Sequence, residues 1–227
     1  MALASNAVDK KSKINRYYAS RVYADREGYE ILSWSSREVQ MLRFKVLLDI
    51  MRRHFCETAC PRLLDVGCGL GELASFLEKA GFPVKYTGVD ITEEVLAEGR
   101  RRHAELDLRL LDVFQKKCPF GEQSFDVVYA SGIFNMELGN NEAFAHTALR
   151  RFQYLSSKLV VANFLHARSS FQPRICHYYL PEKLLEALDE NKYVAQTHED
   201  YLDNDFTLEL LRLGGGHEGT RRGTKAH

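Results

Sequence analysis

The sequence lacks an excess of charge of either sign, because 31 Lys and Arg residues balance 31 Asp and Glu residues among 227. Proteins that hold nucleic acid along a broad surface carry a basic excess, so the balance disfavours that class of partner and leaves only a local basic patch open. No run of 18 apolar residues occurs, and no apolar segment follows the N-terminal methionine. These absences argue against a transmembrane helix and against a secretory signal.

Cysteine is scarce and irregularly placed. The five cysteines are scattered between positions 56 and 176, without CxxC spacing and without the even count of a disulfide scaffold. Such a set is typical of reduced thiols in a cytoplasmic protein. We therefore predict a cytoplasmic location and no metal site.

The length and composition indicate one good-sized globular domain with additions, since 45% of the residues are apolar and 27% are charged. We divide the chain into an N-terminal arm or lid at 1–35, one domain at 36–212 and a flexible glycine-rich tail at 213–227. The arm is polar and rich in Tyr and Arg. It either folds over a ligand or is a frayed extension on the surface.

Strands and helices alternate through the middle of the chain. Apolar periodicity predicts strands at 62–66, 85–90, 107–112, 125–130 and 158–164, and helices at 36–53, 72–80, 93–102, 142–156 and 181–188. Two further strands, 193–198 and 206–211, are joined by the turn Asp203-Asn204-Asp205, which is too short for a parallel crossover. The expected fold is a doubly wound α/β sheet of seven mostly parallel strands, with an antiparallel last strand and an N-terminal helical cap.

A glycine-rich turn follows the first strand. Leu63–Val66 leads into glycines at 67, 69 and 71, and a helix begins at Glu72. This G-x-G-x-G spacing differs from the G-x-G-x-x-G of dinucleotide-binding folds. The carboxylate of Glu72 at the start of the helix would repel a pyrophosphate, so the ligand should be neutral or positive at that point.

Acidic residues end the next two strands. Asp90 lies about 20 residues beyond the glycine turn, at the offset where an acid binds ribose hydroxyls. Asp112 can accept an amino hydrogen of adenine, and the apolar residue after it can cover the ring. Each acid also has a plain structural interpretation: Asp90 as the neighbour of a helix cap at Thr92, Asp112 as a turn residue, and Asp65 as a partner of the turn backbone.

The segment Leu63–Glu72, the two strand-end acids and the terminal hairpin resemble the class I S-adenosylmethionine (SAM)-dependent methyltransferases, over roughly residues 36–212. The resemblance implies a Rossmann-like fold, SAM as cofactor and S-adenosylhomocysteine (SAH) as product. It implies that the glycine turn holds the methionine end, Asp90 the ribose and Asp112 the adenine. The expected cofactor contacts are Arg43, Asp65, Gly67, Cys68, Gly69, Gly71, Asp90, Ile91, Asp112, Val113 and Ser131.

Arg43 is a candidate because of its helix position rather than the resemblance. It falls inside the apolar arc of the helix 36–53, which Ser35 and Glu38 are expected to cap. A guanidinium seldom faces a core without a partner. That partner is either a buried acid or the carboxylate of SAM. Trp34, the one tryptophan of the sequence, either covers the cofactor or packs as a hydrophobic staple.

The residues for catalysis are less clearly marked. The segment Ser131–Asn135 follows the fourth strand, where the fold brings the methyl group, and lacks the Asp-Pro-Pro-Tyr typical of enzymes that methylate DNA bases. Asn135 can orient an acceptor, and His166 and His177 are candidate general bases. Asn135 is equally open to interpretation as a turn or cap residue, and a lone histidine is more often a packed or solvated residue than a base.

The expected function is methyl transfer from SAM to an O or N nucleophile of a small or medium-sized acceptor. The Gly-Ile-Phe-Asn, Asp-Tyr and Phe-Thr segments resemble an uncharacterised subgroup that gives no substrate. We expect segments 12–35 and 165–180 to cap the acceptor. Two alternatives remain, an NAD-linked oxidoreductase and a non-catalytic regulatory subunit with this fold. The oligomeric state stays open.

Overall fold

The computed structural model describes residues 2–22, 26–56, 58–186 and 188–213, with side chains from residue 10 onward. Nearly all of the predicted tail lies outside the described residues. Within them, no helix is both long and apolar enough to cross a membrane. All five cysteines are free thiols.

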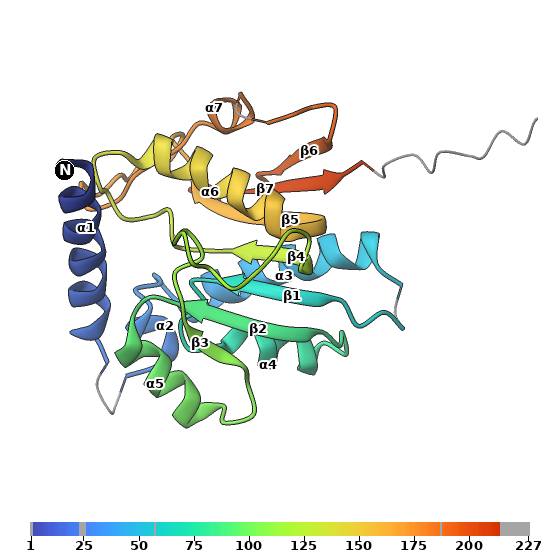
Figure 1. Cartoon of the computed structure of the whole chain (residues 1–227), viewed down its shortest axis with the longest axis horizontal. Coiled ribbons are helices and arrows are strands. Elements are labelled where there is room, and N and C mark those ends of the chain that lie inside the picture. Colours follow the sequence, from blue (N-terminus) through green and yellow to red (C-terminus); the bar gives the residue numbers. More distant parts are fainter. Residues whose placement is uncertain (1, 23–25, 57, 187, 214–227) are drawn as a thin grey trace, which may run out of the picture.

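A seven-stranded sheet forms the centre of the molecule (Figure 1). The strands are β1 (Arg62–Val66), β2 (Lys85–Asp90), β3 (Leu108–Leu110), β4 (Phe125–Ala130), β5 (Ser156–Leu165), β6 (Tyr193–His198) and β7 (Asp205–Arg212). Their order is β3-β2-β1-β4-β5-β7-β6. Strand β7 runs antiparallel to both of its neighbours, whereas the other pairings are parallel. The predicted mostly parallel sheet and antiparallel last strand are confirmed.

Helices cover both faces of the sheet. On one face α3 (Arg37–His54) and α4 (Glu72–Lys79) pack in a core cluster with β1, β4 and β5. On the other face α6 (Asn141–Leu155) packs against the same central strands. The remaining helices of the domain are α5 (Glu93–Arg102) and the short α7 (Pro181–Leu185). This arrangement confirms the doubly wound architecture.

Several predicted boundaries were wrong by a few residues. Helix α3 is capped by Ser36 rather than Ser35, because the Ser36 hydroxyl accepts the Val39 amide. Helix α7 ends three residues early and β3 is shorter than expected. The largest error concerns Asp205, which belongs to β7 and is fully buried rather than part of the turn. In a sequence, a charged residue just before an apolar run indicates a turn. It can be buried in the strand only when a partner in the core pairs with its charge.

The N-terminal arm is helical. Helix α1 (Ala2–Ala19) stands across the carboxyl ends of the parallel strands, and α2 (Gly28–Ile31) follows it (Figure 1). Polar side chains fasten α1 to the body: Lys11 pairs with Asp112, and Lys13 donates to the Glu137 carbonyl at 3.1 Å. The expected helical cap is therefore present, and the frayed extension was the wrong alternative.

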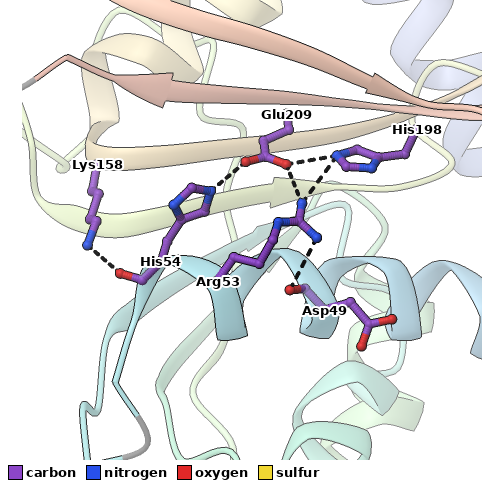
Figure 2. A network of polar contacts seen from close by, with 6 residues as sticks. All are labelled: Asp49, Arg53, His54, Lys158, His198 and Glu209. Carbon is purple, nitrogen blue, oxygen red and sulfur yellow. Dashed lines mark hydrogen bonds and ion pairs between the residues drawn. The ribbon is translucent and has the colours of Figure 1, made fainter.

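Helix α3 and strand β7 are joined at two points. At the carboxyl edge of the sheet Arg43 pairs with Asp205, and toward the other end Glu209 receives contacts from Arg53, His54 and His198 (Figure 2). Burial alone would raise the pKa of Glu209, but the hydrogen bonds of both histidines and the charge of Arg53 outweigh it and lower the pKa to about 2. The network thus anchors the antiparallel strand to the helical layer.

Candidate functional site

A pocket opens at the carboxyl ends of β1, β2 and β4, beneath α1, the position at which open α/β sheets bind ligands. Of the predicted cofactor contacts, its wall contains Gly67, Asp90, Ile91, Asp112, Val113 and Ser131. The other five lie outside this wall within the described chain: Arg43, Asp65, Cys68, Gly69 and Gly71. The wall is mainly apolar, which suits a ligand with a flat ring and few charges.

The glycine turn owes its shape to left-handed backbone. Gly67, Gly69 and Gly71 have φ values of 76°, 56° and 80°, which side chains rarely allow. A Cβ on Gly67 would lie 2.2 Å from Cγ2 of Ile133, in the turn after β4. The backbone of β1 and the turn after β4 therefore approach each other as only glycine permits, and both line the pocket.

Asp90 is held in place by the turn that it faces. Its Oδ2 accepts the Gly69 amide at 3.1 Å, and its Oδ1 accepts the Thr92 amide at 2.9 Å. Burial raises the pKa of Asp90, although these backbone hydrogen bonds oppose the rise. Since a carboxylate oxygen can accept more than one hydrogen bond, both oxygens can also receive ligand hydroxyls. The expected side-chain cap by Thr92 is absent; its hydroxyl donates instead to Asn15 of α1.

Lys11 of the N-terminal helix α1 occupies the Asp112 carboxylate, which was expected to contact the adenine. Its Oδ1 accepts the Phe114 amide at 2.8 Å, whereas its Oδ2 pairs with Lys11. Asp112 is buried and Lys11 is 44% exposed. The carboxylate oxygen that would receive an adenine amino group is thus already bound by a cation of α1.

Asp65 lies behind the pocket wall and contacts a tyrosine rather than the turn backbone. The Tyr86 hydroxyl donates to its Oδ2 at 2.7 Å. Burial, with a smaller contribution from the nearby charge of Asp90, raises the pKa of Asp65 to about 7, against the lowering effect of Tyr86. Its ionisation is therefore sensitive to pH near neutrality.

The structure supplies the buried acid that Arg43 requires. Arg43 Nε lies 2.5 Å from Asp205 Oδ2, and the two residues are 3% and 0% exposed. The guanidinium carbon lies 4.1 Å from the centre of the Trp34 ring, and Trp34 lines the pocket. Arg43 thus reaches the pocket wall through Trp34.

The three predicted catalytic residues lie outside the pocket wall within the described residues. His166 is buried against Phe206, its Nε2 lies 3.1 Å from Glu199 and its Nδ1 accepts the Arg168 amide. His177 Nδ1 lies 2.8 Å from Glu137. Asn135 is nearer to the site, because it lies between wall residues Ile133 and Met136, and its carbonyl accepts the His177 amide.

Sequence reasoning named the segment 12–35 as a cap but not which of its side chains line the pocket, and it missed the wall residues that follow Ser131–Asn135. Ile14 and Tyr18 of α1, Leu32 after α2, and Met136 and Leu138 after β4 all line the pocket. Burial, aided by nearby Tyr17 and Asp90, raises the pKa of Tyr18. The aromatic arm was the available signal, but its helical register gave no indication of which side chains turn inward.

Comparisons with known proteins agree with this geometry. Residues 63–153 match the family model of the methyltransferase domain. A demethylmenaquinone methyltransferase of Chlorobaculum parvum is 38% identical over 78 residues, 34% of this chain and 31% of that protein. A fatty-acid O-methyltransferase of Mycolicibacterium smegmatis is 37% identical over 67 residues, 30% of this chain and 24% of that protein. The chain therefore spans about a third or less of the curated relatives that it matches.

Comparison of folds extends the similarity to methyltransferases from residues 63–153 to most of the chain. The magnesium protoporphyrin IX methyltransferase of Synechocystis with bound SAH superposes with a TM-score of 0.64 at 16% identity, covering 89% of this chain and 99% of that one. Residues 63–153 thus resemble the methyltransferase domain, and the chain shares the fold of SAM-dependent methyltransferases of known structure. A second methyltransferase of this fold, the geranyl diphosphate C-methyltransferase of Streptomyces coelicolor, gives a TM-score of 0.60 at 13% identity, covering 89% of this chain and 98% of that one.

Proposed function

We propose that this protein is a class I methyltransferase that transfers a methyl group from SAM to an O or N nucleophile of a small or medium-sized acceptor. The observation that carries the proposal is the pocket at the carboxyl edge, where Gly67 of the glycine turn, Asp90 and Asp112 line one continuous cavity. The match of residues 63–153 to the methyltransferase domain supports the same activity.

Along the chain, the pocket residues contact SAM in turn from its methionine end to its adenine. Gly67, which leaves no room for a side chain beside Ile133, borders the methionine end. Asp90 receives the ribose hydroxyls on oxygens that the turn amides already orient. Asp112 and Val113 contact the adenine, which requires Lys11 to yield one carboxylate oxygen. SAM supplies an electrophilic methyl group on its sulfonium.

The chain's contribution to catalysis is positioning and the exclusion of water. An acceptor held in line with the methyl group gains most of its rate from that alignment, and a closed apolar wall favours a step in which charge is dispersed. Segment 12–35 forms the proposed lid, with Tyr18 and Trp34 among the wall residues, whereas no residue of 165–180 lines the pocket in the described chain. We assign to Asn135, which lies between wall residues Ile133 and Met136 in the sequence, the role of orienting the nucleophile. Because His166 is engaged at both ring nitrogens, we assign it no proton transfer.

The alternatives make different demands on the site. An NAD-linked oxidoreductase needs a pyrophosphate at the start of α4, where Glu72 stands and accepts a hydrogen bond from Gln40 at 2.8 Å. A regulatory subunit needs no intact cofactor pocket. Both are less well supported than methyl transfer.

Mass spectrometry provides the test of the proposed reaction. A cell extract incubated with methyl-labelled SAM and the protein should yield a labelled O- or N-methylated small molecule, and the same extract with an Asp90→Ala variant should not. Labelled product on carbon would overturn the choice of nucleophile. Bound SAM without any labelled product across many extracts would favour the regulatory subunit.

A further inference from the structure

Two side chains near the start of α3, Trp34 and Arg43, form a stack beside the pocket with Asp205 from the start of β7. Arg43 is 162 residues from Asp205 and yet contacts it at 2.5 Å, with both side chains buried. The guanidinium lies 4.1 Å from the centre of the indole ring. A buried guanidinium that is both ion-paired and stacked has little freedom to move.

The indole ring forms the pocket wall at the turn after β4. A Cβ on Gly132 would lie 3.1 Å from Cη2 of Trp34, so the ring packs directly over that glycine. Trp34, Ser131 and Gly132 all line the pocket. The position of the ring therefore determines the shape of the cavity at the end of β4.

Each member of the stack also keeps a buried polar atom without a hydrogen-bond partner among the described residues: Trp34 Nε1, Arg43 Nη1 and Asp205 Oδ1. Core packing alone seldom leaves such groups unpaired. Three unpaired atoms in one stack are expected where a site is built for a task other than maximal stability.

We propose that Arg43 and Asp205 are positioning residues that act through Trp34. Asp205 fixes the guanidinium of Arg43, and the guanidinium holds the indole ring against Gly132. Trp34 is thereby fixed as the wall of the pocket on the side where the acceptor approaches the methyl group. The last step rests on the proposed function, whereas the immobilisation of Trp34 by the ion pair does not.

Trp34 is the only tryptophan of the sequence, so fluorescence excited selectively at tryptophan rather than at the 11 tyrosines reports on this wall alone. Asp205→Asn keeps the shape of the side chain and removes its charge. In the ligand-free protein we expect the acrylamide quenching constant of Trp34 to at least double. We expect the Kd of SAH, measured by calorimetry, to rise about tenfold.

A second variant and a matched control separate positioning from general destabilisation. Arg43→Lys keeps the charge but loses the planar face over the indole, so quenching should rise while the Tm falls less than in Asp205→Asn. The control is Arg53→Met. This change removes the ion pair between Arg53 of α3 and Glu209 of β7, in which Nη2 and Oε2 lie 2.7 Å apart. It should lower the Tm but leave both Trp34 quenching and SAH affinity within twofold of wild type.

A second ligand tests the competing role of Arg43 as a direct partner of the SAM carboxylate. 5′-Methylthioadenosine lacks the amino-acid end of SAH. If Arg43 acts through Trp34, Arg43→Lys should weaken the binding of both ligands by similar factors. Weakened SAH with unchanged methylthioadenosine and unchanged quenching would overturn the proposal. Unchanged quenching and affinity in a folded Asp205→Asn or Arg43→Lys protein would also overturn it. If wild-type protein does not bind SAH, the proposed function fails, but quenching of the ligand-free variants still decides whether the ion pair positions Trp34.

Discussion

Along the carboxyl edge of the sheet, the half formed by β1, β2 and β3 takes its polar groups from strand ends and the turns that follow them. Asp90 and Asp112 each accept an amide only two residues further along the chain. The half formed by β4, β5 and β7 is built from long-range pairs instead. Arg43 meets Asp205 across 162 residues, and Asn163 donates to the Tyr201 hydroxyl across 38.

This difference explains which functions each half can carry. Local hydrogen bonds preorganise a carboxylate as soon as its strand and turn form, which suits a cofactor site shared across a family. Long-range pairs depend on the packing of several elements, which suits an acceptor site that differs between proteins of one fold. Four substitutions test this division, in order of decreasing expected effect.

Gly67→Ala should abolish most SAH binding, with a loss of about 100-fold, because the added methyl group meets Ile133 while the backbone is left-handed. Gly81→Ala is a matched control, since Gly81 has a φ of 69° and its Cβ would meet nothing within 4 Å. The control should lose only about 1 kcal/mol of stability and keep its SAH affinity. Equal affinities for the two variants would show that the contact with Ile133 does not shape the site.

Asp90→Ala should weaken SAH binding at least tenfold, because charge-assisted hydrogen bonds to the ribose contribute about 1.5–3 kcal/mol each. Calorimetry measures the affinity, and circular dichroism checks that the variant is folded. The control is Asp107→Asn. Asp107 precedes β3, at the end of the strand opposite to Asp112, and this variant should bind SAH with normal affinity. Because burial raises the pKa of Asp90, the wild-type affinity should fall on acidification at a higher pH than an ordinary aspartate would allow. An unchanged affinity in folded Asp90→Ala would remove the ribose assignment.

Glu209→Gln should change stability but not binding, because no residue of the network in Figure 2 lines the pocket. The folded pKa of about 2 lies below the ordinary value of 4.5, so the ionised carboxylate stabilises the fold fully above about pH 4.5. That contribution, roughly 3 kcal/mol, is lost as the pH falls from 4.5 to 2 and below. Wild-type and Glu209→Gln unfolding curves should therefore differ at pH 7 and converge near pH 2. Parallel curves over this range would exclude the predicted role of Glu209.

Lys11→Met should have the smallest effect. Removing the partly exposed cation frees Asp112 Oδ2 for the ligand and loosens α1, in proportion to the few tenths of a kcal/mol typical of such pairs. SAH affinity should rise by no more than about threefold, while amide exchange in α1 becomes faster. A marked loss of affinity would mean that Lys11 binds the ligand rather than competing with it.

The sequence was sufficient for the sheet, its helical layers and the pocket residues that follow the first strands. These features depend on apolar periodicity, on glycines that need left-handed backbone and on acids at strand ends. The partner of Arg43 could not be predicted, because Asp205 stands in a turn-like run and its burial depends on the pairing of β7 with β5. The same reason applies to Lys11 and Tyr18, whose positions over the pocket depend on how α1 docks.

The most direct test of the central claim is a calorimetric titration of the wild-type protein with SAH and, in parallel, with NAD. We predict a single SAH site that is saturated at micromolar to submillimolar ligand, accompanied by a change in Trp34 fluorescence, and no heat of binding with NAD. Saturable binding of NAD without binding of SAH would contradict the assignment of this pocket to a methyltransferase.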